Sequence, residues 1–313
     1  MYDTVNLRLL QSEVGKVDFL SEIPCHLTNI WESYPKDNDS VTIAGNLNNL
    51  KVSVNRRQMK IKDGSLCKWY LGDNFKTMGR GDVQRAIEKL SDILHLPISK
   101  ATITRFDIAQ NFITRYPTEV YLNHLGELRY ATRLQEPDGI YYNQTWGRLC
   151  FYDKNKEQRA KNEPIPELYK GRNVFRYEQR YLKRIAQHLN VEKVTGAMLY
   201  DEQFYIKVLN NWRDNYKSIQ KINDVTLNFA EVKTKQQLNK MGVLSLVELM
   251  GGQVKMIEQI TNAQKRGELT KKQAFDLRQA IKDAYQLKEG ITVKSDAIAE
   301  LDKKIDEAIK FYR

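Results

Sequence analysis

Segments in which polar and apolar side chains alternate with a period of two dominate the first 180 residues. Residues 2–9, 101–113 and 173–181 show the pattern most clearly. This is the pattern of a strand that is buried on one face. Because an amphipathic helix needs a period near 3.6, these segments can bury their apolar side chains together only as strands. The alternation therefore predicts a β-sheet with one apolar face and one polar face.

Further strands are expected between these three segments. The Asp63-Gly64 step is a turn signal, so a hairpin is predicted between strands at 57–62 and 66–71. Shorter strand-like runs complete the expected sheet and lie at 40–46, 50–54, 139–143 and 147–153.

A few helices are predicted among the strands. Apolar residues recur with helical spacing over 81–95, and Asp82 is the expected N-cap of that helix. Shorter helices are expected at 118–125 and 154–162. Many antiparallel strands with few helices are typical of an α+β fold.

The pattern becomes helical after residue 181. Helical spacing extends over 181–220 and over nearly all of 226–313, where glycines interrupt it. We therefore expect a sheet domain at 1–225 and a helical C-terminal domain at 226–313, which would bind DNA, dimerise or recruit a partner.

The composition favours an intracellular protein with a polyanionic partner. Lys and Arg number 50 against 39 Asp and Glu, which gives a net charge of +11 and favours nucleic acid. The three cysteines form no CxxC pair, which favours a reduced, cytoplasmic setting. The chain shows no signal peptide, and no apolar run approaches the roughly 18 residues of a membrane span.

An aspartate stands in the middle of the expected strand 101–113. Arg105, Asp107 and Asn111 share the polar face of this strand. Aspartate is depleted in strands and is costly to bury without a partner. An ion pair with Arg105 or another arginine would explain the aspartate, and a functional role is the alternative.

A tyrosine and a lysine end the expected strand 147–153. Tyr152 and Lys154 lie two residues apart and would point the same way if the strand continued. A nearby ammonium group would lower the phenol pKa from its usual value of about 10, and a tyrosine must lose its proton to attack phosphorus. An ordinary strand tyrosine beside a surface lysine is the alternative.

A glutamate stands between two arginines on the expected strand 173–181. Arg176, Glu178 and Arg180 share one face, and Lys183 and Arg184 follow directly. A structural ion pair would explain this pattern. A metal ligand surrounded by phosphate-binding arginines would explain it equally well.

In their order and spacing, these three motifs resemble the gene II/X family of filamentous-phage and plasmid rolling-circle replication initiators, which are distant relatives of the HUH endonucleases. The resemblance covers roughly residues 2–200 and includes the opening Asp3-Thr4-Val5 strand and the expected strand at Ser65–Gly72. The motifs read ITRFDIAQNF at 103–112, FYDKNKE at 151–157 and FRYEQRYLKR at 175–184.

The resemblance implies an HUH-like nuclease domain that nicks one DNA strand. Tyr152 would be the nucleophile, and Lys154 would activate it or hold phosphate. Tyr141 and Tyr142 are rival nucleophiles on the neighbouring expected strand. The basic side chains around the motifs would hold DNA and comprise Arg105, Arg148, Arg176, Arg180, Lys183 and Arg184.

The resemblance also implies a cofactor, Mg²⁺ or Mn²⁺, because such enzymes use these hard ions and oxygen ligands suit them. Asp107 and Glu178 would be the ligands. The histidine pair of the wider HUH class is absent, since the four histidines lie outside the motifs. Which further residue completes the ligand set stays open among Asn111, Asp153 and Glu157.

The implied activity is initiation of rolling-circle DNA replication in a bacterial host cell. The enzyme would act on a single-stranded or hairpin origin, and would leave a 5′-phosphotyrosine and a 3′-OH for a host polymerase. A host helicase is a further expected partner, because no P-loop is present. A homodimer is a separate expectation. The alternatives are a non-catalytic DNA-binding replication or copy-control protein, a mobilisation relaxase and an RNA-binding protein.

Overall fold

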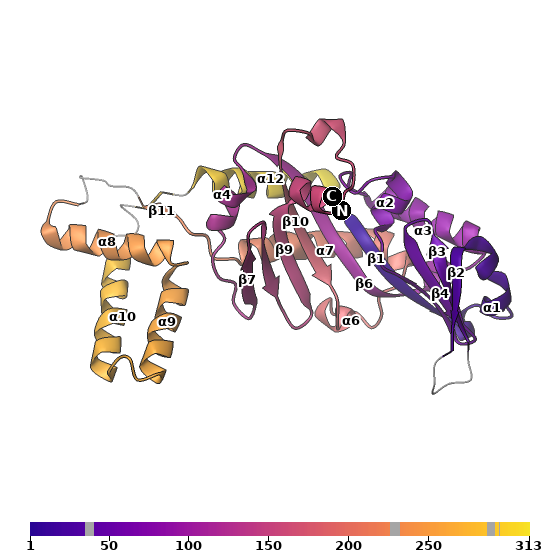
Figure 1. The fold of residues 1–313 in the computed structure, drawn as a ribbon, viewed down its shortest axis with the longest axis horizontal. Helices are drawn as coiled ribbons and strands as arrows, with labels where there is room; N and C mark the ends of the chain where they lie inside the picture. Colours follow the sequence, from indigo (N-terminus) through magenta and orange to yellow (C-terminus); the bar gives the residue numbers. More distant parts are fainter. Residues whose placement is uncertain (35–40, 226–231, 287–291, 294) are drawn as a thin grey trace.

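One antiparallel sheet of ten strands forms the main body of the protein, in the order β2-β3-β4-β5-β1-β6-β10-β9-β8-β7 (Figure 1). The computed structural model describes residues 1–34, 41–225, 232–286, 292–293 and 295–313. The strands of this sheet are β1 Tyr2–Leu10, β2 Thr28–Ser33, β3 Thr42–Leu47, β4 Leu50–Asn55, β5 Gln58–Lys62, β6 Thr102–Thr114, β7 Thr132–Glu136, β8 Gly139–Asn143, β9 Gly147–Asp153 and β10 Asn173–Tyr181.

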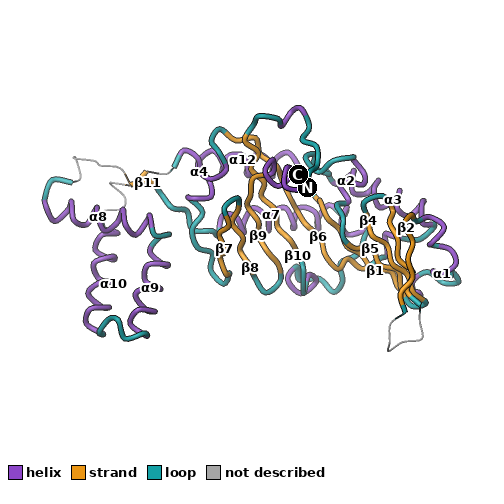
Figure 2. The backbone as a smooth tube through the Cα atoms, viewed as in Figure 1, coloured by secondary structure: helices purple, strands orange, loops and turns teal. Residues whose placement is uncertain are grey.

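Helices accompany the first part of the sheet and dominate the last third of the chain (Figure 2). The expected α+β class is therefore confirmed. The α-helices of the described residues are α1 Phe19–Glu22, α2 Leu66–Leu71, α3 Arg80–Leu94, α4 Thr118–Asn123, α5 Lys154–Ala160, α6 Ile185–His188, α7 Glu202–Lys217, α8 Lys235–Leu249, α9 Gln253–Lys265, α10 Lys271–Tyr285 and α12 Asp296–Tyr312.

The alternation in β10 gives the sheet its two faces. Tyr177 faces α7, where its ring stacks on Trp212 at a centroid distance of 4.5 Å and its hydroxyl donates to the Trp212 carbonyl. Phe151 of β9 stacks on the other side of Tyr177 at 4.4 Å. Such aromatic contacts add to the apolar burial that holds the layers together. The neighbouring residues Arg176 and Glu178 necessarily face the other way.

The expected strand at 66–71 is wrong, because these residues form helix α2. The Ser65 hydroxyl accepts a hydrogen bond from the Lys68 amide and caps the helix. Leu66 and Trp69 are buried on one side, and Gly72 ends the helix with a positive φ. The capping serine and the terminal glycine outweigh the short apolar run.

Two smaller expectations also need correction. Helix α3 begins at Arg80 with Gly79 as its N-cap, and Asp82 accepts from the Gly79 amide at 2.9 Å from inside the first turn. The segment 181–220 is only partly helical, since Tyr181 ends β10 and the main helix there is α7.

The C-terminal helices divide between two sites of packing. Leu301 and Ile305 of α12 are buried in the same apolar core as the sheet. Helices α8, α9 and α10 form their own small core, which includes Val247, Ile260 and Ile281. In Figure 1 these three helices stand beside the β7 edge of the sheet. The expected domain boundary after residue 225 falls at 226–231, outside the described residues.

None of the described helices combines the length and the apolar character that a membrane crossing requires.

Candidate functional site

The polar face of the sheet brings the three sequence motifs together. In the register between β9 and β10, Arg176 lies opposite Tyr152, and Arg180 lies opposite Arg148. On the other side of β10, Arg180 lies opposite Asp107 of β6. Three segments that are far apart in the sequence therefore form one continuous polar face of the sheet, on the side away from α7, and the side chains at its centre are buried.

Tyr152 and Glu178 are joined by a hydrogen bond on this face of the sheet. The Tyr152 hydroxyl donates to Glu178 Oε2 at 2.8 Å. Tyr152 is only 8% exposed, and this burial raises its pKa well above the usual value of about 10. The phenol and one of the predicted acids thus do meet, but the phenol is a poor nucleophile in this arrangement.

Two arginines hold the Glu178 carboxylate. Arg180 Nε lies 2.7 Å from Oε1, and Arg176 Nε lies 3.3 Å from Oε2. Burial alone would raise the pKa of Glu178, but the charges of Arg180 and Arg176 outweigh burial and hold that pKa well below its usual range. The carboxylate is therefore ionised and a weak base while both arginines stay in place.

Arg176 lies at the centre of a buried network. It contacts Asp3 at 2.6 Å and Asn111 Oδ1 at 3.0 Å, and its guanidinium also donates to the Asn74 carbonyl. Asp3 in turn accepts from the Ser65 hydroxyl. Because Arg176 is only 2% exposed, its expected role in DNA binding is not supported by its position. Its donors are committed to partners inside the protein.

Asp3 is the member of this network that sequence reasoning missed. It stands in the opening strand, and an aspartate in a strand needs a partner as much as Asp107 does. That signal was available in the sequence. The identity of its partner was not, because Arg176 lies 173 positions further along the chain.

Asp107 is paired with Arg105, as the structural interpretation of this motif predicts. The guanidinium makes two hydrogen bonds to the carboxylate, at 3.0 and 2.6 Å. Burial nevertheless raises the pKa of Asp107 to about 7, with the nearby Glu178 charge adding to the rise and Arg105 opposing it.

Lys154 begins helix α5 instead of continuing the strand. Its ammonium is buried and bonds Glu157 at 2.7 Å, while the Tyr152 hydroxyl bonds Glu178. Burial lowers the pKa of Lys154. In this arrangement no direct contact between Lys154 and the Tyr152 hydroxyl supports the expected activation of Tyr152 by this lysine.

The other predicted basic residues are accessible to a ligand. Arg105 and Arg180 keep 27% and 29% of their side-chain surface exposed. Arg148 is also partly exposed and bonds Asn143 at 2.6 Å. Lys183 and Arg184 are exposed just beyond β10. These five side chains are positioned to meet a polyanion on this face or at its end.

The two rival tyrosines lie on opposite faces of β8. Tyr142 is fully buried on the helix side, and its hydroxyl donates to the Gly126 carbonyl at 2.7 Å. Tyr141 is only partly buried and lies opposite Cys150, on the same face as Tyr152. Its ring lies 5.8 Å from the Arg148 guanidinium. Burial raises the pKa of Tyr141, and the two nearby arginines oppose that rise.

The carboxylates of this face do not form an open cation site as they stand. All four oxygens of Asp107 and Glu178 accept hydrogen bonds from arginines or from Tyr152. Across the described residues, no three His, Cys, Asp or Glu side chains gather where they could hold a metal ion.

The three residues among which the choice of a further ligand was left open are occupied elsewhere. Asn111 bonds Arg176, Asp153 caps α5, and Glu157 bonds Lys154. Oxygen chemistry suits Mg²⁺ or Mn²⁺, but side chains would have to rearrange before an ion could bind.

Residues 1–244 match the family described as the N-terminal part of the phage gene II replication-associated protein. The chain belongs to this family. Its resemblance to the gene II initiators of phage rolling-circle replication is thereby confirmed, over a longer stretch than the motifs indicated. None of the curated proteins matches the chain. The family region includes the whole ten-stranded sheet and ends within α8.

Proposed function

We propose that this replication initiator is an HUH-like endonuclease that nicks one strand of an origin through a tyrosine. The observation that carries the proposal is the hydrogen bond from Tyr152 to Glu178 on a sheet face that also bears Arg105, Arg148 and Arg180. A phenol, a carboxylate that can take its proton and partly exposed guanidinium groups are the parts that phosphoryl transfer to tyrosine needs.

The proposed reaction is one transesterification. The Tyr152 oxygen bonds to the scissile phosphorus, and the bond from phosphorus to the 3′ oxygen breaks. The phenol proton passes to Glu178, and the 3′ oxygen takes up a proton to become the 3′-OH. A 5′-phosphotyrosine remains, and the reverse reaction rejoins the strand ends. No bond energy is lost in either step, so no nucleotide hydrolysis is needed.

Binding of DNA would activate the tyrosine through Arg180. This arginine holds Glu178 at 2.7 Å but is partly exposed, so an incoming phosphate can draw it away from the carboxylate. Weaker pairing raises the pKa of Glu178 and makes it a better acceptor for the Tyr152 proton. The resting arrangement would thus keep the phenol protonated until the substrate arrives.

Tyr141 is the second candidate nucleophile within the same proposal. Its greater exposure favours it, because Tyr152 is almost completely covered. Among the described residues Tyr141 makes no comparable hydrogen bond to a carboxylate, and the bond from Tyr152 to Glu178 therefore favours Tyr152.

The wider function includes several partners that we keep as proposals. The origin would be single-stranded or a hairpin, a host polymerase would extend the 3′-OH, and a host helicase would open the duplex. Mg²⁺ or Mn²⁺ remains the expected cofactor, with Asp107 and Glu178 as the residues to test. We also propose a division into a nicking domain at 1–225, against which α12 packs, and a helical domain within 226–313 that binds DNA, dimerises or recruits a partner.

The test is to incubate the protein with supercoiled DNA that carries its origin and with Mg²⁺ or Mn²⁺. We expect a nicked product with the protein bound covalently, which Tyr152→Phe abolishes while DNA binding survives. Tyr130→Phe is the matched control, because Tyr130 is 82% exposed and lies outside the three motifs. Mass spectrometry of the DNA-linked peptide identifies the attacking tyrosine.

An adduct that persists in Tyr152→Phe but not in Tyr141→Phe would transfer the role to Tyr141. Binding without any nick or adduct in the wild type would instead support a non-catalytic DNA-binding initiator.

A further inference from the structure

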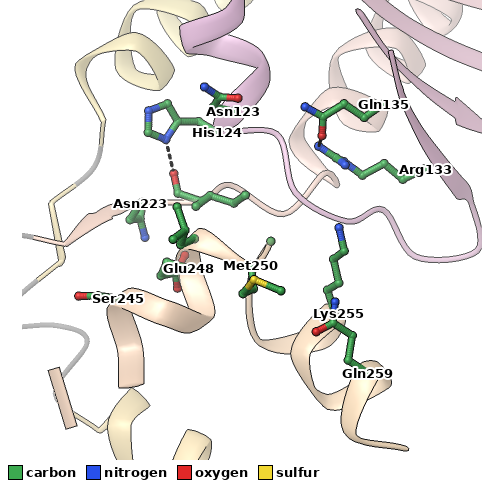
Figure 3. Close-up of a pocket in the computed structure, with 13 residues that line it drawn as sticks. Asn123, His124, Arg133, Gln135, Asn223, Ser245, Glu248, Met250, Lys255 and Gln259 are labelled. Atoms are coloured by element: carbon green, nitrogen blue, oxygen red, sulfur yellow. Dashed lines mark hydrogen bonds between the residues drawn. The ribbon is translucent and has the colours of Figure 1, made fainter. Parts of the chain in front are cut away.

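A cleft of about 620 Å³ lies where the helices α8 and α9 meet the β7 edge of the sheet (Figure 3). One wall comes from the end of α4 and from β7, and the other comes from the end of α8 and the start of α9. The volume lies within the range of small-ligand sites, about 300–1,000 Å³. The cleft can therefore admit a group the size of a nucleotide but not a duplex.

Two cationic side chains face this cleft from opposite walls. Arg133 of β7 is partly buried and is held by hydrogen bonds to the Leu125 carbonyl and to Gln135. Lys255 is in the first turn of α9, and in Figure 3 it extends from the helix toward the wall formed by Arg133 and Gln135. Among the described residues, no carboxylate lies within ion-pair distance of Lys255.

The remaining polar lining is mostly neutral. Four amide side chains line the cleft, namely those of Asn123, Gln135, Asn223 and Gln259. Glu248 also lines it, but this carboxylate is buried and accepts from the Tyr285 hydroxyl at 2.7 Å. Cations together with amides are the side chains that proteins use for phosphates and for base edges.

The turn between α8 and α9 forms part of the cleft lining and packs closely. Gly251 and Gly252 both have positive φ values, which favour glycine. A Cβ on Gly252 would lie 2.3 Å from the side-chain nitrogen of Gln220, and a Cβ on Gly251 would lie 2.8 Å from the Lys255 stem. The two glycines therefore permit the close approach of the turn to Gln220 and to the stem of Lys255, which lines the cleft.

The face of the sheet that bears Tyr152 and Glu178 is called the nicking face, and the cleft lies round the edge of the sheet from it. Arg133 pairs with Tyr142, so it is on the side of the sheet opposite Tyr152. A flexible single strand that leaves the nicking face can pass round β7, which is the outermost strand at this end. A stiff duplex cannot make that turn without a large bending cost.

We propose that this cleft binds an unpaired nucleotide of the origin strand, with Arg133 and Lys255 on its phosphates and the amides on its sugar or base. The inference takes DNA as the ligand from the proposed function. Lys255 and Gln259 lie beyond residue 244, where the family match ends, so the cleft adds a contact that the family region alone does not contain.

The test measures binding of the full chain to a fluorescein-labelled, single-stranded 20-mer by fluorescence anisotropy over a range of salt concentrations. Lys255→Gln should lower the slope of log affinity against log salt by about 0.7, the value for one phosphate contact on a single strand. If wild type and variant bind equally at 1 M salt, the variant should therefore bind about fivefold more weakly than wild type at 0.1 M salt. Lys265→Gln, at the other end of the same helix, is the matched control and should behave as wild type.

A neutral variant separates the amides from the charges. Gln259→Ala should weaken binding of the same 20-mer without changing its salt slope, because no charge is lost. Equal effects of Lys255→Gln and Lys265→Gln, no effect of Lys255→Gln, or no binding of the 20-mer by wild type would each overturn the proposal. A Lys255→Gln effect in a protein that never nicks DNA would leave the cleft in place and refute the proposed nicking function instead.

Discussion

Replacing Arg176 by methionine should destabilise the fold more than it weakens DNA binding. The guanidinium lies 2.6 Å from Asp3 and 3.3 Å from Glu178, and all three groups are largely buried. Removing one partner of a buried ion pair costs about 3–5 kcal/mol, because a buried charge is left uncompensated. Since Arg180 still holds Glu178, we expect a value near the lower limit, about 3 kcal/mol.

Thermal unfolding followed by circular dichroism measures this loss. At about 2–4 °C per kcal/mol for a domain of this size, Arg176→Met should melt roughly 6–12 °C below wild type. Arg180→Met is the matched control on the same strand. Its side chain is 29% exposed and Arg176 would still hold Glu178, so its loss should cost less stability than the loss of Arg176 and should act mainly on DNA binding.

The result that refutes this reasoning is an Arg176→Met variant that melts with wild type but binds DNA more weakly than Arg180→Met does. Arg176 would then reach DNA in solution, as the sequence alone led us to expect, and the buried network would be open in the working protein.

Two further predictions concern the acids. Burial raises the pKa of Asp107 to about 7, so between pH 4 and 7 the folded chain keeps a proton that the unfolded chain loses, and rising pH lowers stability. Asp107→Asn should therefore gain melting temperature relative to wild type between about pH 5 and pH 8; a constant difference would contradict the shift. If Asp107 and Glu178 hold the ion, Asp107→Asn and Glu178→Gln should raise the Mn²⁺ concentration for half-maximal nicking by about tenfold or more. An unchanged requirement in both variants would place the ion elsewhere.

Much of the fold could be predicted because its signals are local. The period of two in β1, β6 and β10 fixed which side chains share a face, and those strands form within two residues of their predicted bounds. The prediction for segment 66–71 was wrong because six residues are too few to distinguish the strand period of two from the helix period of 3.6. There the cap at Ser65 and the stop at Gly72 were the better signals.

The candidate site could be predicted only in part. Asp107, Tyr152 and Glu178 were singled out because charged or reactive side chains in strands need an explanation, and they do share one face. Asp3 was missed, and Lys154 was expected beside Tyr152, because the sequence does not say where the strand ends and α5 begins.

The sequence by itself determined the class of fold, the family and the division of each strand into a polar and an apolar side, since these depend on residues that are neighbours along the chain. Only the tertiary structure decided which charge meets which. Arg176 is buried between Asp3 and Glu178, while Arg180 remains partly exposed. The strand pattern does not distinguish them, because both side chains point to the same face of β10. The strands and loops that cover one arginine and not the other come from distant parts of the chain, and packing alone brings them there.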